Sequence, residues 1–322
     1  MLLALLFVGI GLAGLYLGGE WLVKGAARLA DSFGVSSRVI GLTIVAWSTS
    51  APELVVGIDA ALKGSPEISL GNVLGSNIAN IGLVLSVMAL CAPLVVHPQL
   101  LKREIPLMVA TALLAALLAL DGKLDRLDGA ILLFSFLFVT WLLYRWIKRD
   151  QRILAIEAQT YAEHEELNRE PPRPPSRWLE AGWTAAGLAL LIEGANLTVE
   201  GAATLARTWG VSELIIGVSL VALGTSLPEL VTAIVTALHK ETELGIGNVV
   251  GSNIANILAI LGVTALISPI RITPTVLHFD LPWMIGFSLL LLLLALDRRI
   301  QRWKAVLLLG GYIGFVVLLF FR

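Results

Sequence analysis

Charged residues are scarce in this chain, and cysteine is almost absent. Only 15% of the 322 residues are Asp, Glu, Lys or Arg, whereas 57% are hydrophobic, and the formal net charge is −1. A nearly neutral chain offers no basic surface for nucleic acid. Cys91 is the only cysteine, which excludes an intrachain disulfide and leaves the redox compartment open. The sequence has no HExxH, GxSxG or Cys-His pairing, so we do not expect an enzyme.

Long apolar runs fill most of the sequence. We therefore predict an all-α polytopic membrane protein embedded in a lipid bilayer. About ten transmembrane helices are expected, at 2–29, 36–63, 69–94, 99–120, 128–148, 178–206, 211–238, 246–268, 277–296 and 303–321. The N-terminal run is expected to be an uncleaved first span, because neither a basic region nor a cleavage site accompanies it.

One polar, proline-rich stretch, which includes EHEELNREPPRPPSR, separates two blocks of five spans. It is too short for a folded domain and has the composition of a linker. We expect residues 1–149 to form a first five-span repeat, 150–177 the polar cytoplasmic linker, and 178–322 a second five-span repeat.

Lysine and arginine are distributed unevenly over the predicted loops. If the N-terminus lies outside, the outer loops hold only Lys63, Lys123, Arg126, Arg207 and Arg271, with Arg322 at the end. The bias predicts that both termini lie outside and that the linker is cytoplasmic. Because five is an odd number, the second half must insert upside down, which gives an inverted-topology repeat.

Two long segments of the chain are nearly the same. Residues 41–62 read GLTIVAWSTSAPELVVGIDAAL, and residues 217–238 read GVSLVALGTSLPELVTAIVTAL. An offset of 176 residues aligns them without a gap, and it also aligns GNVLGSNIANI (71–81) with GNVVGSNIANI (247–257). Each copy brings an acid, Glu53 or Glu229, into an apolar span. A duplicated ionisable residue within the bilayer indicates a transporter whose substrate site lies between paired repeats.

A proline directly precedes each acid. Pro52 has no N–H for the carbonyl of Ser48 and disfavours helical geometry at Ala51. We expect the helix to break there and to free carbonyl oxygens near Ala46, and near Ala222 in the second copy. The neighbouring hydroxyl groups belong to Thr49, Ser50, Thr225 and Ser226. Together with the two carboxylates these are hard oxygen donors, which suit Ca²⁺ and Na⁺ rather than soft metals.

The helix that follows each acid carries a polar stripe. The stripe consists of Asn72, Ser76 and Asn80 in the first half and of Asn248, Ser252 and Asn256 in the second. Residues four apart share one side of a helix, and glycines keep that side small, so that another backbone can approach closely. Two such helix pairs, related by a pseudo-twofold axis, would bring both acids to one cavity at the midplane. Two ionised glutamates carry about −2, which matches one Ca²⁺.

These paired blocks, G-T-S-x-P-E followed by G-N-x-x-G-S-N-I-x-N, resemble the α-repeats of the cation/Ca²⁺ exchanger superfamily. They are most similar to those of bacterial and archaeal sodium/calcium exchangers. The resemblance implies ten helices, of which the first and sixth slide across a compact core, and it implies that Glu53 and Glu229 bind Ca²⁺ and also serve Na⁺. The rest of the implied ligand set comprises Thr49, Ser50, Ser76, Thr225, Ser226 and Ser252, the carbonyl groups of Ala46 and Ala222, and Asn80 and Asn256 at the centre.

Two positions depart from the pattern of the family. Many members carry Asp where this chain has Asn256, so the implied site has two formal charges rather than three. In potassium-dependent relatives that Asp is associated with K⁺ use, so the resemblance argues against K⁺ dependence here. Ser48, beside the bulky Trp47, replaces the usual glycine of the first block, which leaves the coupling stoichiometry open. The short linker has no room for a Ca²⁺-sensing domain.

The leading hypothesis is a secondary antiporter that exchanges Na⁺ for Ca²⁺ by alternating access. The nearest alternative is a Ca²⁺/H⁺ antiporter on the same scaffold, in which protonation of Glu53 and Glu229 replaces Na⁺ binding. A passive cation channel would use similar oxygen ligands, but inverted halves favour alternating access. Ca²⁺ and Na⁺, or H⁺ in the alternative, are the expected substrates, and neither a cofactor nor an obligate protein partner is implied.

Overall fold

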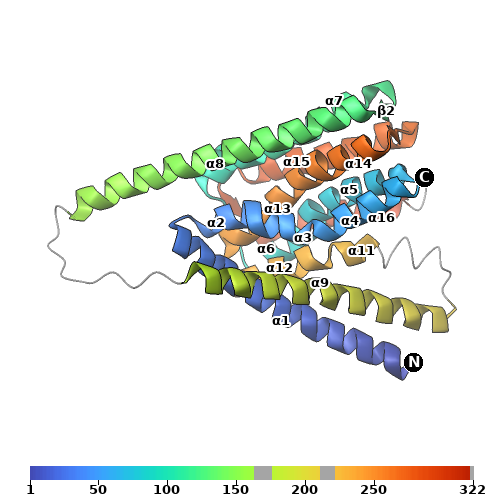
Figure 1. Cartoon of the computed structure of the whole chain (residues 1–322), viewed down its shortest axis with the longest axis horizontal. Coiled ribbons are helices and arrows are strands. Elements are labelled where there is room, and N and C mark those ends of the chain that lie inside the picture. Colours follow the sequence, from blue (N-terminus) through green and yellow to red (C-terminus); the bar gives the residue numbers. More distant parts are fainter. Residues whose placement is uncertain (163–175, 211–221, 320–322) are drawn as a thin grey trace.

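The computed structural model describes residues 1–162, 176–210 and 222–319, which form helices and two short ladders (Figure 1). The first half contains α1 (Leu2–Phe33), α2 (Ser37–Ile40), η1 (Gly41–Val45), α3 (Ala46–Thr49), α4 (Ala51–Leu62), α5 (Pro66–Ala79), η2 (Asn80–Val84), α6 (Leu85–Cys91), β1 (Leu94–Val95), η3 (Leu100–Glu104), α7 (Ile105–Leu118), η4 (Ala119–Asp121), β2 (Lys123–Leu124) and α8 (Arg126–Ala162). The second half contains α9 (Arg177–Thr208), α11 (Ala222–Thr225), α12 (Leu227–Leu238), α13 (Thr242–Ala255), η6 (Asn256–Ile260), α14 (Leu261–Ile267), β3 (Ile270–Arg271), η7 (Val276–Asp280), α15 (Leu281–Leu294), β4 (Arg299–Ile300) and α16 (Arg302–Leu319).

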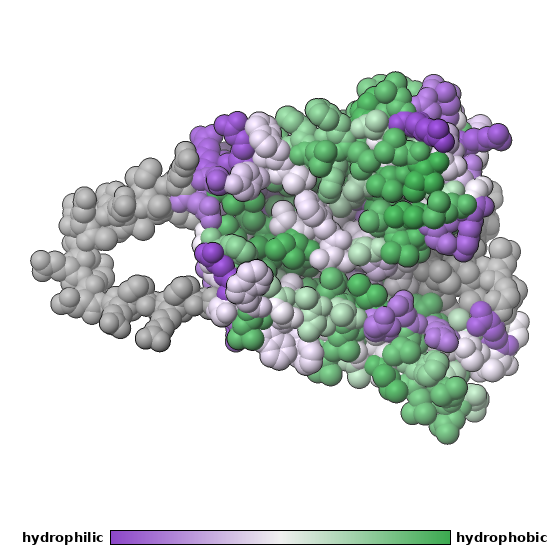
Figure 2. Space-filling model, viewed as in Figure 1, coloured by the Kyte–Doolittle hydropathy of each residue, from purple (hydrophilic) through white to green (hydrophobic). Residues whose placement is uncertain are grey.

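The described helices have the length and hydropathy of membrane spans. Nine of the helical runs in this part of the chain are long and apolar enough to cross a bilayer, and α12 is a shorter apolar helix. Helix α12 lies within the seventh predicted span, of which residues 211–221 fall outside the described residues. Hydrophobic side chains cover the middle of the molecular surface, and hydrophilic side chains gather toward its two ends (Figure 2). The chain is therefore an all-α polytopic membrane protein, as the sequence predicted.

Two small antiparallel ladders reveal how the halves are related. Strand β1 pairs with β4, and β2 pairs with β3. The 176-residue offset makes β1 equivalent to β3, and β2 equivalent to β4. Because β1 and β2 lie at opposite ends of η3 and α7, equivalent strands of the two halves lie at opposite ends of the molecule. The two five-helix repeats are therefore inverted, which confirms the expected topology.

The centre of the molecule is built from the two helical runs that carry the GNxxGSNIxN motif. In the apolar windows of residues 66–91 and 242–267, 78% of the residues are buried, whereas the other spans reach at most 44%. A side chain added at Gly251 would overlap the Leu42 carbonyl oxygen, and one at Gly247 would overlap the Arg38 carbonyl oxygen. Gly247 and Gly251 therefore let α13 lie directly against η1 and the backbone around it, as their spacing predicted. A Cβ atom at Gly71 or Gly75 in α5 would meet nothing within 4 Å among the described residues, so the close approach is seen only for α13.

Helices α1 and α9 form a separate antiparallel pair along one side of the bundle (Figure 1). Their glycines recur every seven residues, at 11, 18 and 25 in α1 and at the equivalent positions 187, 194 and 201 in α9. A Cβ atom at Gly18 would meet the backbone of Leu191, and a Cβ atom at Gly194 would meet the backbone of Leu15. Helices α1 and α9 therefore touch backbone to backbone, a packing that small residues alone permit.

Helix α8 is longer than the span that hydropathy predicts. It continues from Arg126 to Ala162, whereas the predicted fifth span ends at residue 148. Residues 149–162 contain neither proline nor glycine and are rich in good helix formers, so no residue in this segment ends the helix. The Gln151 amide of this extension donates hydrogen bonds to the carbonyl oxygens of Phe33 and Gly34, which ties α8 to the end of α1.

Candidate cation site

A break in each of two helices places an acid near the midpoint of the fold. Helix α3 ends at Thr49, and α4 begins at Ala51, with Ser50 between them at φ −80° and ψ 3°. Ser226 takes nearly the same conformation between α11 and α12, at φ −91° and ψ 0°. Proline in the first turn starts each new helix, since its missing N–H is not needed there. Glu53 and Glu229 therefore lie in the first turns of α4 and α12.

The expectation of a bare carbonyl group is not met at Ala46. Its oxygen accepts hydrogen bonds from the Ser50 N–H at 3.1 Å and from the Ser252 hydroxyl at 3.3 Å. The reason is that helical bonding continues through Ser50 before the chain breaks. The bond to Ser252 brings α3 of the first half against α13 of the second, so the Ala46 carbonyl and the Ser252 hydroxyl lie together.

The two carboxylates are buried without hydrogen-bond partners. Glu53 and Glu229 are each 1% exposed, and all four of their carboxylate oxygens lack a hydrogen-bond partner among the described residues. The two groups lie close enough to repel each other, with Thr225 beside Glu53 and Thr49 beside Glu229. A buried charge is costly unless it is paired or binds a metal ion. Four carboxylate oxygens without hydrogen-bond partners therefore fit a bound cation.

Asparagines of one half hold the threonines of the other. The Thr49 hydroxyl donates to the Asn248 amide oxygen at 3.2 Å, and the Thr225 hydroxyl donates to the Asn72 amide oxygen at 3.4 Å. A hydroxyl group that donates its hydrogen keeps its lone pairs for another partner. The Thr49 oxygen can therefore accept a cation beside the two carboxylates, and Thr225 lies at the equivalent position of the second half.

Most of the predicted ligands are buried in the structure. The residues that are at most 6% exposed are Thr49, Ser50, Glu53, Ser76, Asn80, Ser226, Glu229, Ser252 and Asn256. Thr225 is partly buried, and Ala222 begins α11. The Ser50 hydroxyl and the amide oxygens of Asn80 and Asn256 also lack hydrogen-bond partners within the described residues. These neutral oxygens extend the set of unpartnered donors beyond the two acids.

Two other acids in the apolar helices, Glu20 and Asp59, have basic partners. Glu20 forms an ion pair of 2.6 Å with Lys24 and a contact of 2.7 Å with His239. Asp59, two turns beyond Glu53 in α4, pairs with Lys63 at 2.7 Å and is exposed. Among the described residues, no group of three or more His, Cys, Asp or Glu could hold a metal ion. The carboxylates of Glu53 and Glu229 are thus distinguished by their burial and by their lack of a cationic partner.

Two buried asparagines beside the predicted ligands do not belong to the predicted set. Asn77 and Asn253, which are 2% and 1% exposed, hydrogen-bond to Asn256 and Asn80 across the boundary between the halves. Each lies one position after a predicted serine and is off the i, i+4 stripe. The identity of the GSNIAN hexapeptide in the two repeats is the signal that could have included them.

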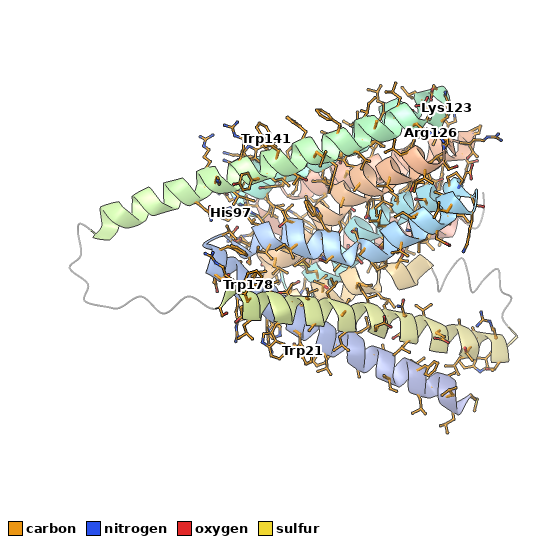
Figure 3. All side chains as sticks on the ribbon, viewed as in Figure 1. Trp21, His97, Lys123, Arg126, Trp141 and Trp178 are labelled. Carbon is orange, nitrogen blue, oxygen red and sulfur yellow. The ribbon has the colours of Figure 1, made fainter. Side chains whose placement is uncertain are left out.

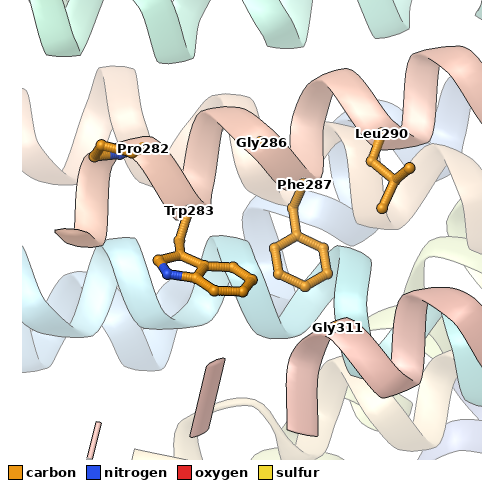
Figure 4. Close-up of a pocket in the computed structure, with 6 residues that line it drawn as sticks. All are labelled: Pro282, Trp283, Gly286, Phe287, Leu290 and Gly311. Carbon is orange, nitrogen blue, oxygen red and sulfur yellow. The ribbon is translucent and has the colours of Figure 1, made fainter. Parts of the chain in front are cut away.

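An apolar groove lies apart from these polar groups, between α15 and α16 (Figure 4). Its volume is about 250 Å³, and its lining consists of Pro282, Trp283, Gly286, Phe287, Leu290 and Gly311. The lining has no carboxylate, hydroxyl or amide side chain. It therefore cannot replace the hydration shell of a cation and suits an apolar neighbour such as a lipid chain.

Two inverted helical repeats around a shared buried centre of oxygen donors define a membrane transporter rather than an enzyme. The family model described as "Sodium/calcium exchanger protein" matches residues 3–145 and again residues 179–321. The chain therefore belongs to the sodium/calcium exchanger family.

Full-length relatives agree with this assignment. The inner membrane protein YrbG of Escherichia coli is 36% identical over 99% of this chain and 98% of its own length. The sodium/calcium exchanger MaX1 of Methanosarcina acetivorans is 35% identical over 97% of both chains. A solved structure of the sodium-calcium exchanger NCX_Mj superimposes with a TM-score of 0.84 at 33% identity, over 98% of both chains. The fold is that of the exchanger, and the chain is a cation antiporter of this family.

Proposed function

We propose that this protein is a secondary antiporter that exchanges Na⁺ for Ca²⁺ across a membrane by alternating access. The observation that carries the proposal is the pair of buried, mutually repelling carboxylates with four unpartnered oxygens. One divalent cation would neutralise both acids, and monovalent cations would divide the same oxygens among themselves. Hard oxygen ligands of variable number suit both Ca²⁺ and Na⁺. Competition for one set of ligands is what couples the two fluxes.

The ligands proposed for the two ions come equally from both halves. They are Glu53, Thr49, Ser50, Ser76, Asn80 and the Ala46 carbonyl from residues 1–149, and Glu229, Thr225, Ser226, Ser252, Asn256 and the Ala222 carbonyl from residues 178–322. Because the halves are inverted, exchanging their conformations would open the same site to the opposite face of the membrane. The α1–α9 pair, which packs through glycines, is the proposed moving element.

The distribution of basic residues supports an orientation with both termini outside and the linker in the cytoplasm. His97, which follows β1, lies at the opposite end of the bundle from Lys123 and Arg126 (Figure 3). The end with β1 and β4 carries Arg298, Arg299 and Arg302 and is the proposed cytoplasmic face. A relative that is named an inner membrane protein supports the inner (plasma) membrane as the location.

Proton coupling is the second candidate, and the same carboxylates favour it. Two repelling buried acids without a cationic partner can each take up a proton in place of a metal ion. The absence of an acid at Asn256 limits the site to two formal charges, which argues against a role for K⁺. Proton coupling would keep the fold and the site and change only the driving ion.

Uptake of ⁴⁵Ca²⁺ into proteoliposomes tests the proposal. Vesicles loaded with Na⁺ are compared with K⁺-loaded and acid-loaded vesicles, each diluted into the same Na⁺-free buffer. Uptake that depends on the outward Na⁺ gradient alone is expected. Uptake driven by the proton gradient would instead establish Ca²⁺/H⁺ exchange, and equal uptake into all three would indicate a passive pathway.

A further inference from the structure

Four buried asparagines form two parallel hydrogen bonds at the centre of the fold. The Asn80 amide nitrogen donates to the Asn253 amide oxygen at 3.2 Å, and the Asn256 amide nitrogen donates to the Asn77 amide oxygen at 3.1 Å. The offset of 176 residues exchanges these two bonds, so they are one arrangement repeated in both halves. All four side chains are at most 2% exposed, which leaves bulk water no part in orienting them.

A second layer of contacts fixes the amide groups of Asn77 and Asn253. The Asn253 nitrogen faces the Met108 sulfur at 3.5 Å, and the Asn77 nitrogen faces the Met284 sulfur at 3.8 Å. The Asn77 nitrogen also donates to the backbone carbonyl of Asn253 at 3.2 Å. Met108 and Met284 are equivalent residues of α7 and α15, and a thioether sulfur accepts hydrogen bonds but cannot donate them. A sulfur on this side therefore requires the nitrogen of each amide to face it, and the oxygen to face Asn80 or Asn256.

The orientation of Asn77 and Asn253 determines which way the amide groups of Asn80 and Asn256 face. With its nitrogen bound to Asn253, the Asn80 side chain directs its oxygen away from that bond, and the oxygen lacks a partner among the described residues. The Asn256 oxygen is in the same position. Both asparagines begin a wide π-helical segment, η2 or η6, and such segments are frequent at functional sites. An amide oxygen can bind a cation, whereas an amide NH₂ repels one.

We propose that Asn253 and Asn77 are positioning residues that make Asn80 and Asn256 present an oxygen, and not an NH₂ group, to the transported cation. This inference rests on the proposed function of Asn80 and Asn256 as ligands. The two ends of an amide have nearly the same shape, so packing alone does not select one of them. The chain of contacts from Met108 through Asn253 to Asn80 supplies that selection, and its counterpart runs from Met284 through Asn77 to Asn256. The pairing is crosswise, because each half orients the ligand of the other.

The test combines Asn253→Leu with Asp substitutions of the two ligands. In the otherwise unaltered protein, Asn253→Leu is expected to raise the apparent KM for Ca²⁺ about tenfold, by the loss of one orienting hydrogen bond. In an Asn80→Asp background the same change is expected to raise KM less than about twofold, because a carboxylate presents an oxygen in either orientation. Asn256→Asp is the matched control background: it adds the same charge but leaves Asn80 dependent on Asn253, so the increase stays at about tenfold.

The mirror experiment reverses the backgrounds. The increase in KM for Ca²⁺ that Asn77→Leu causes is expected to disappear in the Asn256→Asp background and to remain in the Asn80→Asp background. A merely structural role would lower the amount of active protein and the maximal rate, whereas KM would not depend on which background is used. Equal increases in KM in both backgrounds would overturn the proposal. Since KM can be measured with whichever gradient drives uptake, that result is distinct from a failure of Na⁺ coupling.

A milder variant keeps the proposal testable if Asn253→Leu does not fold. Met108→Leu preserves the size of the side chain and removes only the sulfur that faces Asn253. It is expected to raise KM for Ca²⁺ about two- to threefold, and this rise should vanish in the Asn80→Asp background. An unchanged KM in Met108→Leu would contradict the relay from the sulfur to the ligand.

Discussion

The Thr49 hydroxyl donates a hydrogen bond of 3.2 Å to the Asn248 amide oxygen, which lies in the other half of the molecule. The equivalent bond, from Thr225 to Asn72, measures 3.4 Å. Each half thus supplies the amide that holds a threonine hydroxyl group of the other half, just as each supplies one of the two acids.

Neutralising either acid tests the site most directly. Glu53→Gln or Glu229→Gln is expected to abolish Ca²⁺ uptake while the protein stays folded, because the amide keeps the shape but removes the charge that a divalent cation requires. Ligand-free protein should lose none of its thermal stability, since the amide keeps the shape of the side chain and carries no charge that burial would penalise. Saturating Ca²⁺ should raise the melting temperature of the unaltered protein and not that of the variants.

Asp59→Asn is the matched control for the acids. Asp59 lies in the same helix as Glu53, but it is exposed and paired with Lys63. Uptake within about twofold of the unaltered protein is expected, because an exposed ion pair contributes little. Normal exchange in either glutamate variant would remove the two acids from the site.

Close packing of α1 against α9 gives a second prediction. Gly18→Val should impair both folding and transport, because its side chain would overlap the backbone of Leu191. Gly9→Val is the control in the same helix, since a Cβ atom at that position meets nothing within 4 Å. Detergent-solubilised Gly18→Val should show a lower melting temperature and a reduced monodisperse fraction, with Gly9→Val close to the unaltered protein. Equal behaviour of the two variants would contradict the backbone-to-backbone contact.

Much of this architecture could be predicted because it repeats in the sequence. Pro52 and Pro228 each remove a helical hydrogen-bond donor, so the breaks at Ser50 and Ser226 follow from local chemistry. The inverted topology follows from an odd number of spans, and the ladders of β1 with β4 and β2 with β3 confirm it. The roles of Thr49 and Glu53 as ion ligands stay predictions, although the structure places them together.

Other features depend on contacts between distant residues, which periodicity does not reveal. The i, i+4 stripe includes Ser76 and Asn80 but passes over Asn77, whose partners lie in the other half. The occupied carbonyl of Ala46 depends on Ser252, 206 residues away. The continuation of α8 beyond the predicted span follows from helix propensity, whereas hydropathy marks only the part suited to the membrane.

A buried lysine in the first turn of α16 gives a prediction about stability. The Lys304 ammonium group is 5% exposed and donates to the carbonyl oxygens of Leu294 and Arg299 and to the Asp297 carboxylate, at 2.6 to 2.8 Å. Lys304→Met leaves these acceptors unpaired and is expected to lower the free energy of unfolding by about 1–3 kcal/mol. Thermal unfolding in detergent measures the loss. Lys63→Met, at an exposed pair, is the control and should change stability little.

The same pair sets a pH dependence with a defined sign. The hydrogen bond from Lys304 holds the pKa of Asp297 below its usual value. A carboxyl group with a lowered folded-state pKa contributes stability above its unfolded pKa, and the contribution is lost as the pH falls through the folded value. The difference in melting temperature between the unaltered protein and Asp297→Asn should therefore be present at neutral pH and shrink in acid. A difference that grows on acidification would contradict the ion pair.

Asn256 gives the last prediction, because an Asp at this position would give the site three acids instead of two. Asn256→Asp adds a third carboxylate beside Glu53 and Glu229 and leaves the size of the side chain unchanged. The added charge should favour a divalent ion over a proton or a monovalent ion, so the apparent affinity for Ca²⁺ should change together with its dependence on pH and Na⁺. Uptake is measured across pH 6–8 with Na⁺, K⁺ or Na⁺ plus K⁺ inside the vesicles. Asn80→Asp is the symmetric control, since it adds the same charge from the other half. Unchanged ion preference in both variants would show that neither asparagine lies within reach of the transported ion.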